Sequence, residues 1–243
     1  MSLVSHLTEL RNRLLFCSIF YLFFFLISYF FVENIFSFLT QPFSETIANN
    51  DNKRLIYTGL AEVFFNYIKL SLIVGFVFSL PIFIYHVWMF VAPGLLKKEK
   101  KIIVPFLLLV PLMFILGFLV VYYFIIPLAW DFFINFETFF PDQNLKVQLE
   151  AKVNEYLSLI LKLIFAFGLA FQLPVFIFLL TILGVTTYEN LSKYRKYVIV
   201  LIFIIAAVIT PPDVISQIGL ALPIIFLYEL SVFISKFFRK NKK

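Results

Sequence analysis

Long apolar runs dominate the chain and set its fold class. Four of them are long enough to cross a hydrocarbon core of about 30 Å as helices. They occupy residues 14–32, 63–91, 102–130 and 156–184. Because lipid offers the backbone no hydrogen-bond partners, we predict that each run is a transmembrane helix. The two charged residues within them, Lys69 and Lys162, are expected to reach toward the outer interface.

The last third of the chain has a shorter apolar run. Residues 197–209 offer only 13 apolar positions before the turn Thr210-Pro-Pro-Asp213, and residues 214–235 run back. A helix of 13 residues reaches about 20 Å, which is less than the thickness of the core. Either a re-entrant hairpin or two short spans in a thinned bilayer would fit. We favour two short spans, because the basic residues at 193–196 can extend the first of them by snorkelling.

The composition agrees with an all-α polytopic membrane protein of six transmembrane helices, the last two short. The chain has 243 residues, of which 62% are hydrophobic and 14% are charged, and its mean hydropathy is +0.99. A water-soluble domain of this length needs far more polar surface to cover its core. We therefore treat residues 1–243 as a single integral membrane domain.

The distribution of basic residues predicts the orientation in the membrane. If the odd-numbered spans run outward, the inner segments carry 14 Lys and Arg residues and the outer segments carry 4. Cytoplasmic loops are enriched in basic residues, so both termini are predicted to be cytoplasmic. The chain has a net charge of +6, but most of its basic residues are dispersed over four short segments, which argues against a nucleic-acid surface.

Two carboxylates lie among the basic residues of the cytoplasmic rim. Glu9 precedes the first span and is four residues from Arg13, with which it can pair. Glu99 follows the helix-breaking Pro93-Gly94 and lies among four lysines. The simplest interpretation of the segment around Glu9 is a basic flank that sets membrane orientation. The simplest interpretation of the segment around Glu99 is a solvated basic loop. A more specific hypothesis is that the two carboxylates bind the guanidinium groups of a ligand through bidentate, charge-assisted hydrogen bonds.

Few polar groups lie at membrane depth, and they form no catalytic set. Gln172 is predicted to hydrogen-bond a neighbouring helix, and His86 to be a structural part of an interfacial aromatic belt. Glu229 is expected to snorkel or to pair with Lys236, and Asp213 to cap the helix after it. With two histidines and no protease, zinc or phosphate-loop motif, the sequence predicts no enzyme, cofactor or metal site.

Four motifs together resemble the TatC family, the signal-receptor subunit of the twin-arginine protein translocase. The first runs from His6 to Leu14, and the second from Leu80 to Leu95, followed by Glu99. The third, at 165–174, lies in the fourth predicted span, and the fourth, at 210–217, lies in the last outer turn. Because they occur in the family's order and at similar spacing, the resemblance covers the whole chain and is specific.

The resemblance implies a fold and a function. The fold would be a concave, glove-like bundle of six helices. The function would be that of a non-enzymatic receptor for the Arg-Arg signal peptides of folded cargo. Glu9 and Glu99 match the family's arginine-contacting acids, and Arg11, Phe90 and Pro93 match other functional cytoplasmic positions.

The resemblance also implies partners and a location. Single-span TatA/TatB-type subunits would dock on the last two helices, further copies of the chain would join the receptor complex, and the proton-motive force would drive export. Gln172, Asp213 and Gln217 are the polar positions expected to serve docking. Gln172 departs from the family, in which glutamate is frequent at the matching place. The location would be the bacterial inner membrane or an organellar membrane.

Two other functions stay open on the residues alone. An ion-coupled solute transporter would need charged residues along a central pathway, and at mid-membrane the chain offers little beyond Gln172. A structural scaffold would bind partner helices but would have no affinity for signal peptides.

Overall fold

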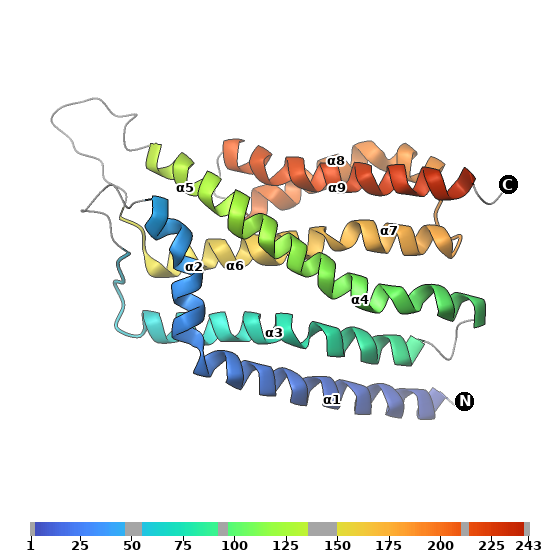
Figure 1. Cartoon of the computed structure of the whole chain (residues 1–243), viewed down its shortest axis with the longest axis horizontal. Coiled ribbons are helices and arrows are strands. Elements are labelled where there is room, and N and C mark those ends of the chain that lie inside the picture. The colour runs from blue at the N-terminus through green and yellow to red at the C-terminus, as the bar shows by residue number, and fades with distance from the viewer. Residues whose placement is uncertain (1–2, 47–54, 92–96, 136–149, 210–213, 241–243) are drawn as a thin grey trace. The chain divides into compact units, whose positions relative to one another are not determined.

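The computed structural model is mainly helical over the residues that it describes, which are 3–46, 55–91, 97–135, 150–209 and 214–240 (Figure 1). In chain order the elements are α1 (Leu3–Phe30), α2 (Val32–Thr46), α3 (Glu62–Val91), α4 (Lys97–Val120), a π-helical turn (Val121–Ile125), α5 (Ile126–Asn135), α6 (Val153–Ala170), α7 (Gln172–Ile182), α8 (Tyr188–Ile209) and α9 (Val214–Lys240). Over this part of the chain the only β-type pairing is one isolated bridge, between Ile56 and Lys152. The predicted all-α class is therefore confirmed.

Five helical stretches within the described residues are long and apolar enough to cross a membrane. They are Ser5–Phe30, Glu62–Phe90, Val104–Phe133, Val153–Ile182 and Gln217–Phe237. They overlap the four long runs and the final run predicted from the sequence. The remaining predicted run lies in α8, whose first turns carry charged residues. The count of six spans therefore stays a prediction.

Helices α8 and α9 extend beyond their apolar runs. α8 has 22 residues and α9 has 27, because both continue as helix through the basic segments at 188–196 and 236–240. At about 1.5 Å per residue, α8 is roughly 33 Å long. The shortness predicted for this part of the chain thus concerns the apolar portion of α8 rather than the helix itself.

Helix α2 was not among the elements predicted from the sequence. This helix begins one residue after α1 ends. Its residues Val32, Leu39 and Phe43 are all buried, and their spacing of seven and four puts them on one helical face. This periodicity could have indicated a helix. Pro42 lies within the segment and argued against one, because proline usually interrupts a helix.

The chain forms two compact units, one of residues 1–38 and 63–112 and the other of residues 39–62 and 113–243. In the first unit, α1 and α3 pack closely. A Cβ atom added to Gly75 of α3 would lie 2.8 Å from the backbone of Phe25 in α1, so glycine permits this approach. The hydroxyl of Tyr21 in α1 also donates a hydrogen bond to the carbonyl of Leu72 in α3 (3.3 Å).

In the second unit, α4 and α6 cross at a similar close contact. A Cβ atom on Gly117 would lie 2.8 Å from the carbonyl oxygen of Phe167. Farther along, α6 ends at Ala170 and α7 begins at Gln172. Pro174 has no N–H to offer the carbonyl of Ala170, which accounts for the break. The fourth predicted run is therefore two helical segments in sequence.

Glu62 ties the segment before α3 to the start of α6. Its carboxylate accepts hydrogen bonds from the backbone N–H groups of Thr58 (2.9 Å), Gly59 (3.1 Å) and Asn154 (3.1 Å). Asn154 lies in the first turn of α6, where N–H groups have no partner inside the helix and negative charge is favoured. This carboxylate, together with the isolated bridge, fixes one end of α6.

Candidate functional site

In the first unit, the N-terminal end of α1 and the C-terminal end of α3 lie together and carry much of the predicted site (Figure 1). His6 of α1 stacks on Phe90 of α3, with ring centroids 4.2 Å apart and 18° between the planes. Phe16 of α1 and His86 of α3 also stack, at 6.1 Å and 7°. Each helix thus contributes one histidine and one phenylalanine to the contact. We call the surface around His6, Phe16, His86 and Phe90 the α1–α3 rim.

Glu9 lies on this rim, one helical turn from His6, and is paired with Arg13. Nε of Arg13 donates to Oε1 of Glu9 at 3.0 Å, and Nη2 of Arg13 donates to the same oxygen. The side chains of Glu9 and Arg13 are only 26% and 17% exposed. The pairing predicted from their spacing is confirmed.

The structure describes some of the other predicted contact residues and not all of them. Phe90 is on the rim, stacked on His6. Arg11 is exposed, and its guanidinium donates to the side chain of Asn12 (3.4 Å). Glu99 lies in the first turn of α4, in the same unit as the rim, but its side chain is not among those described. Pro93 lies outside the described residues.

The polar residues predicted for docking lie in the second unit. Gln172 opens α7, and its Nε2 donates to the carbonyl of Gly168, one turn earlier (3.2 Å). Gln217 of α9 donates through Nε2 to the carbonyl of Phe203 in α8 (3.0 Å). The amide of Gln217 therefore links the two last helices. Asp213 lies outside the described residues.

A further polar contact joins α8 to α9 and was missed in the sequence. Glu229 of α9 pairs with Arg195 of α8, with Oε1 and Nε 2.9 Å apart. Glu229 was expected to snorkel or to pair with Lys236, whereas the ammonium of Lys236 lies 5.5 Å from the ring centroid of Tyr188. The partners are far apart along the chain, so no local spacing signals this pair. Among the described residues no group of three His, Cys, Asp or Glu side chains could hold a metal ion.

Comparison with known proteins identifies the family. The family model TatC, Sec-independent protein translocase protein, matches residues 5–223. TatC of Rickettsia prowazekii is 42% identical over 236 residues, covering 97% of this chain and 93% of the relative. TatC of Escherichia coli K12 is 38% identical over 236 residues, covering 97% and 88%.

A solved structure of the same family matches the fold of this chain. The crystal structure of the twin arginine translocase receptor TatC matches with a TM-score of 0.80 at 37% identity, covering 96% of this chain and 98% of that one. Family membership makes the protein a multi-pass membrane subunit of the Tat pathway and not an enzyme. The chain belongs to the TatC family of Sec-independent protein translocase proteins.

Proposed function

We propose that this chain is the receptor subunit of its translocase and that Glu9 and Glu99 together bind the arginine pair of a signal peptide. The observation that carries the proposal is the geometry at Glu9, whose carboxylate already binds the guanidinium of Arg13. The same hydrogen-bonding chemistry suits an arginine from a ligand. Two such carboxylates select arginine over lysine, because the planar guanidinium offers two parallel donors to each.

The connection between α3 and α4 supports the joint role of the two acids. Five residues separate Val91, at the end of α3, from Lys97, at the start of α4. Six Cα-to-Cα steps reach at most about 22 Å, so Glu99 is tethered to Phe90 and hence to His6 on the rim. Pro93 restricts the conformation of this short connection. Arg11 and the stacked ring of Phe90 complete the proposed contact surface.

The proposal extends to orientation and partners. The basic residues support a bacterial cytoplasmic (inner) membrane protein with both termini in the cytoplasm. An apolar face on α8 supports docking of TatA/TatB-type single-span subunits, and it is formed by Val200, Leu201, Ile204, Ile205 and Val208, all exposed. Gln217 sets this face by holding α8 against α9. Self-association and coupling to the proton-motive force are parts of the proposal that rest on the family resemblance.

Site-specific photocrosslinking tests the receptor role. A photoreactive residue at position 9 or 99 is expected to form adducts with a signal peptide that carries Arg-Arg, and few with a Lys-Lys peptide. A lack of arginine-dependent adducts at both positions, in folded and membrane-inserted protein, would contradict the proposal. The scaffold or the transporter function would then be favoured.

Substitution of the two acids gives the energetic test. A hydrogen bond to a charged group contributes about 1.5–3 kcal/mol, so Glu9→Gln and Glu99→Gln are each expected to weaken signal-peptide binding at least several-fold. The double variant should bind more weakly still. Glu189→Gln removes an acid in the first turn of α8 and serves as the matched control, which should bind normally. Unchanged affinity in the double variant would refute the assignment.

A further inference from the structure

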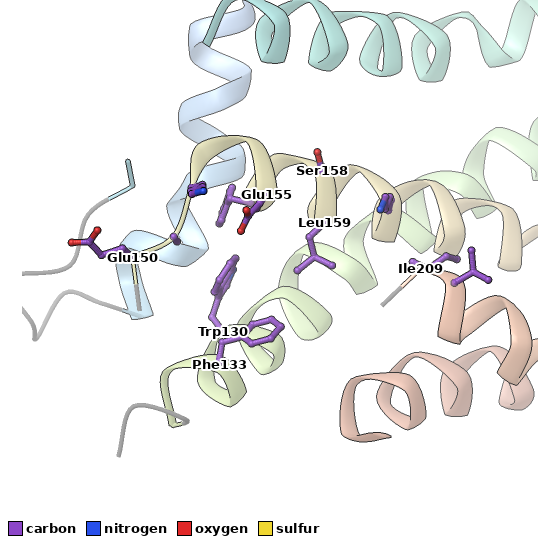
Figure 2. Close-up of a pocket in the computed structure, with 12 residues that line it drawn as sticks. Trp130, Phe133, Glu150, Glu155, Ser158, Leu159 and Ile209 are labelled. Carbon is purple, nitrogen blue, oxygen red and sulfur yellow. The ribbon is translucent and has the colours of Figure 1, made fainter. Parts of the chain in front are cut away.

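A cavity of about 450 Å³ opens in the second unit beside the ends of α5, α6 and α8 (Figure 2). The volume falls within the range of about 300–1,000 Å³ that is usual for small-molecule sites. Figure 2 shows Trp130 rising from α5 toward Glu155 and Leu159 of α6. Ile209 from the end of α8 also lines the cavity. The receptor role proposed above uses none of these residues.

The side chain of Trp130 forms part of the cavity wall and is held in a fixed position. Trp130 is 5% exposed, and its indole N–H has no hydrogen-bond partner in the described part of the chain. The indole is held in place, because it stacks on Tyr156 (5.0 Å, 15°) and meets Phe43 edge to face (5.0 Å). The hydroxyl of Tyr156 is in turn fixed by donating to the carbonyl of Leu39 (2.7 Å). Because the indole nitrogen is itself buried, Trp130 contributes aromatic surface to the wall rather than a hydrogen-bond donor.

Charged side chains of both signs line the same cavity. They are Lys152 and Lys162 on the basic side and Glu150 and Glu155 on the acidic side. Helical side chains lean toward the N-terminus of their helix, so the long chain of Lys162 extends toward the turn that bears Ser158. Glu155 is two turns before Lys162, about 10 Å along the axis, on the same helical face.

The depth of the cavity matches the boundary between hydrocarbon and headgroups. Trp130 lies near the end of the membrane-crossing stretch Val104–Phe133. Lys162 lies nine residues inside the stretch Val153–Ile182, which is about 14 Å from its start. A lysine at this depth places its ammonium at the level of lipid phosphates by extending toward the interface.

We propose that this cavity binds a phospholipid with a zwitterionic phosphoethanolamine headgroup. The phosphate accepts hydrogen bonds from the ammonium of Lys162, while the headgroup ammonium pairs with Glu155. The acyl chains extend out of the cavity alongside Leu159 and Ile209. The equal numbers of acidic and basic side chains in the wall favour a zwitterionic headgroup over an anionic one. The lipid site shares no residue with the α1–α3 rim. The proposal of a lipid site therefore does not depend on the proposed receptor role.

Native mass spectrometry of the purified full chain with dioleoylphosphatidylethanolamine tests the proposal. Wild type should retain one lipid of high affinity. Lys162→Gln should weaken its binding roughly tenfold or more, whereas Trp130→Phe, which keeps the aromatic wall, should change it little. Glu155→Gln should remove the preference over dioleoylphosphatidylglycerol. Lys69→Gln, which changes a lysine in a different membrane-crossing stretch, should retain the lipid.

Three results would overturn the assignment. The first is equal affinity of wild type for the phosphatidylethanolamine and the phosphatidylglycerol. The second is loss of the lipid from Lys69→Gln to the same extent as from Lys162→Gln. The third is displacement of the lipid by millimolar inorganic phosphate, which would indicate a site for soluble anions. If a variant fails to fold, thermal stabilisation of wild type by the two lipids gives the same comparison.

Discussion

At the residue scale, the pairing of Glu9 with Arg13 controls how strongly Glu9 can bind another cation. Arg13→Gln removes the internal partner and one positive charge beside the proposed site. Both effects favour a ligand that carries two guanidinium groups, so we expect binding to strengthen about twofold, in line with the energy of a helical ion pair. Fluorescence anisotropy with a labelled Arg-Arg peptide measures the change.

A matched variant separates charge from geometry at this position. Arg13→Lys keeps the charge but loses the planar guanidinium, so its affinity should fall between those of wild type and Arg13→Gln. Weaker binding by Arg13→Gln would instead mean that Arg13 orients Glu9 for the ligand.

The same contacts show which site residues the sequence could predict. Glu9 and Arg13 are four apart, and helical geometry alone brings such residues together. His6 and Phe90 meet only because α1 and α3 pack, and Arg195 and Glu229 meet only because α8 lies beside α9. Sequence periodicity describes a helix about its own axis and carries no information on which helices adjoin. The pair of Glu9 and Arg13 was therefore predicted, and the pairs between helices were not.

At the element scale, hydropathy predicted the long helices well, because apolar length is what a bilayer selects. It did not reveal the break between α6 and α7, since the residues on both sides of Pro174 are mainly apolar. It also did not reveal α2, whose buried face is a narrow stripe. Close helix crossings depend on single glycines and were likewise invisible to hydropathy.

The crossing of α4 and α6 allows a direct test at Gly117. An alanine Cβ would lie 2.8 Å from the backbone oxygen of Phe167, and a backbone atom cannot move aside without shifting α6. We expect Gly117→Ala to destabilise the protein by about 1–3 kcal/mol, as overpacking commonly does. Thermal unfolding in detergent measures the effect.

Gly219 of α9 is the matched control for this substitution. No atom lies within 4 Å of the Cβ that alanine would add there. Helix propensity then dominates, and Gly219→Ala is expected to be neutral or to stabilise by up to about 1 kcal/mol. Equal destabilisation by both variants would show that the close contact with Phe167 does not limit stability.

At the scale of the whole molecule, the arrangement of α8 and α9 in the membrane decides between six spans and a re-entrant hairpin. α8 is a helix of 22 residues, roughly 33 Å long, which suffices to cross the bilayer when Lys193, Arg195 and Lys196 extend to the interface. Two spans place Asp213 in water on the outer side. A re-entrant hairpin leaves Asp213 within the lipid.

Cysteine labelling distinguishes these arrangements. Cys17 is the only cysteine and is 2% exposed, so wild type provides a low background. With a membrane-impermeant maleimide, Asp213→Cys should be labelled from the outer side of intact cells, and Asn241→Cys only after permeabilisation. A thiol held in lipid does not ionise and reacts poorly. An Asp213→Cys variant that stays unlabelled from both sides would therefore support the hairpin, and labelling only from the inner side would contradict six spans.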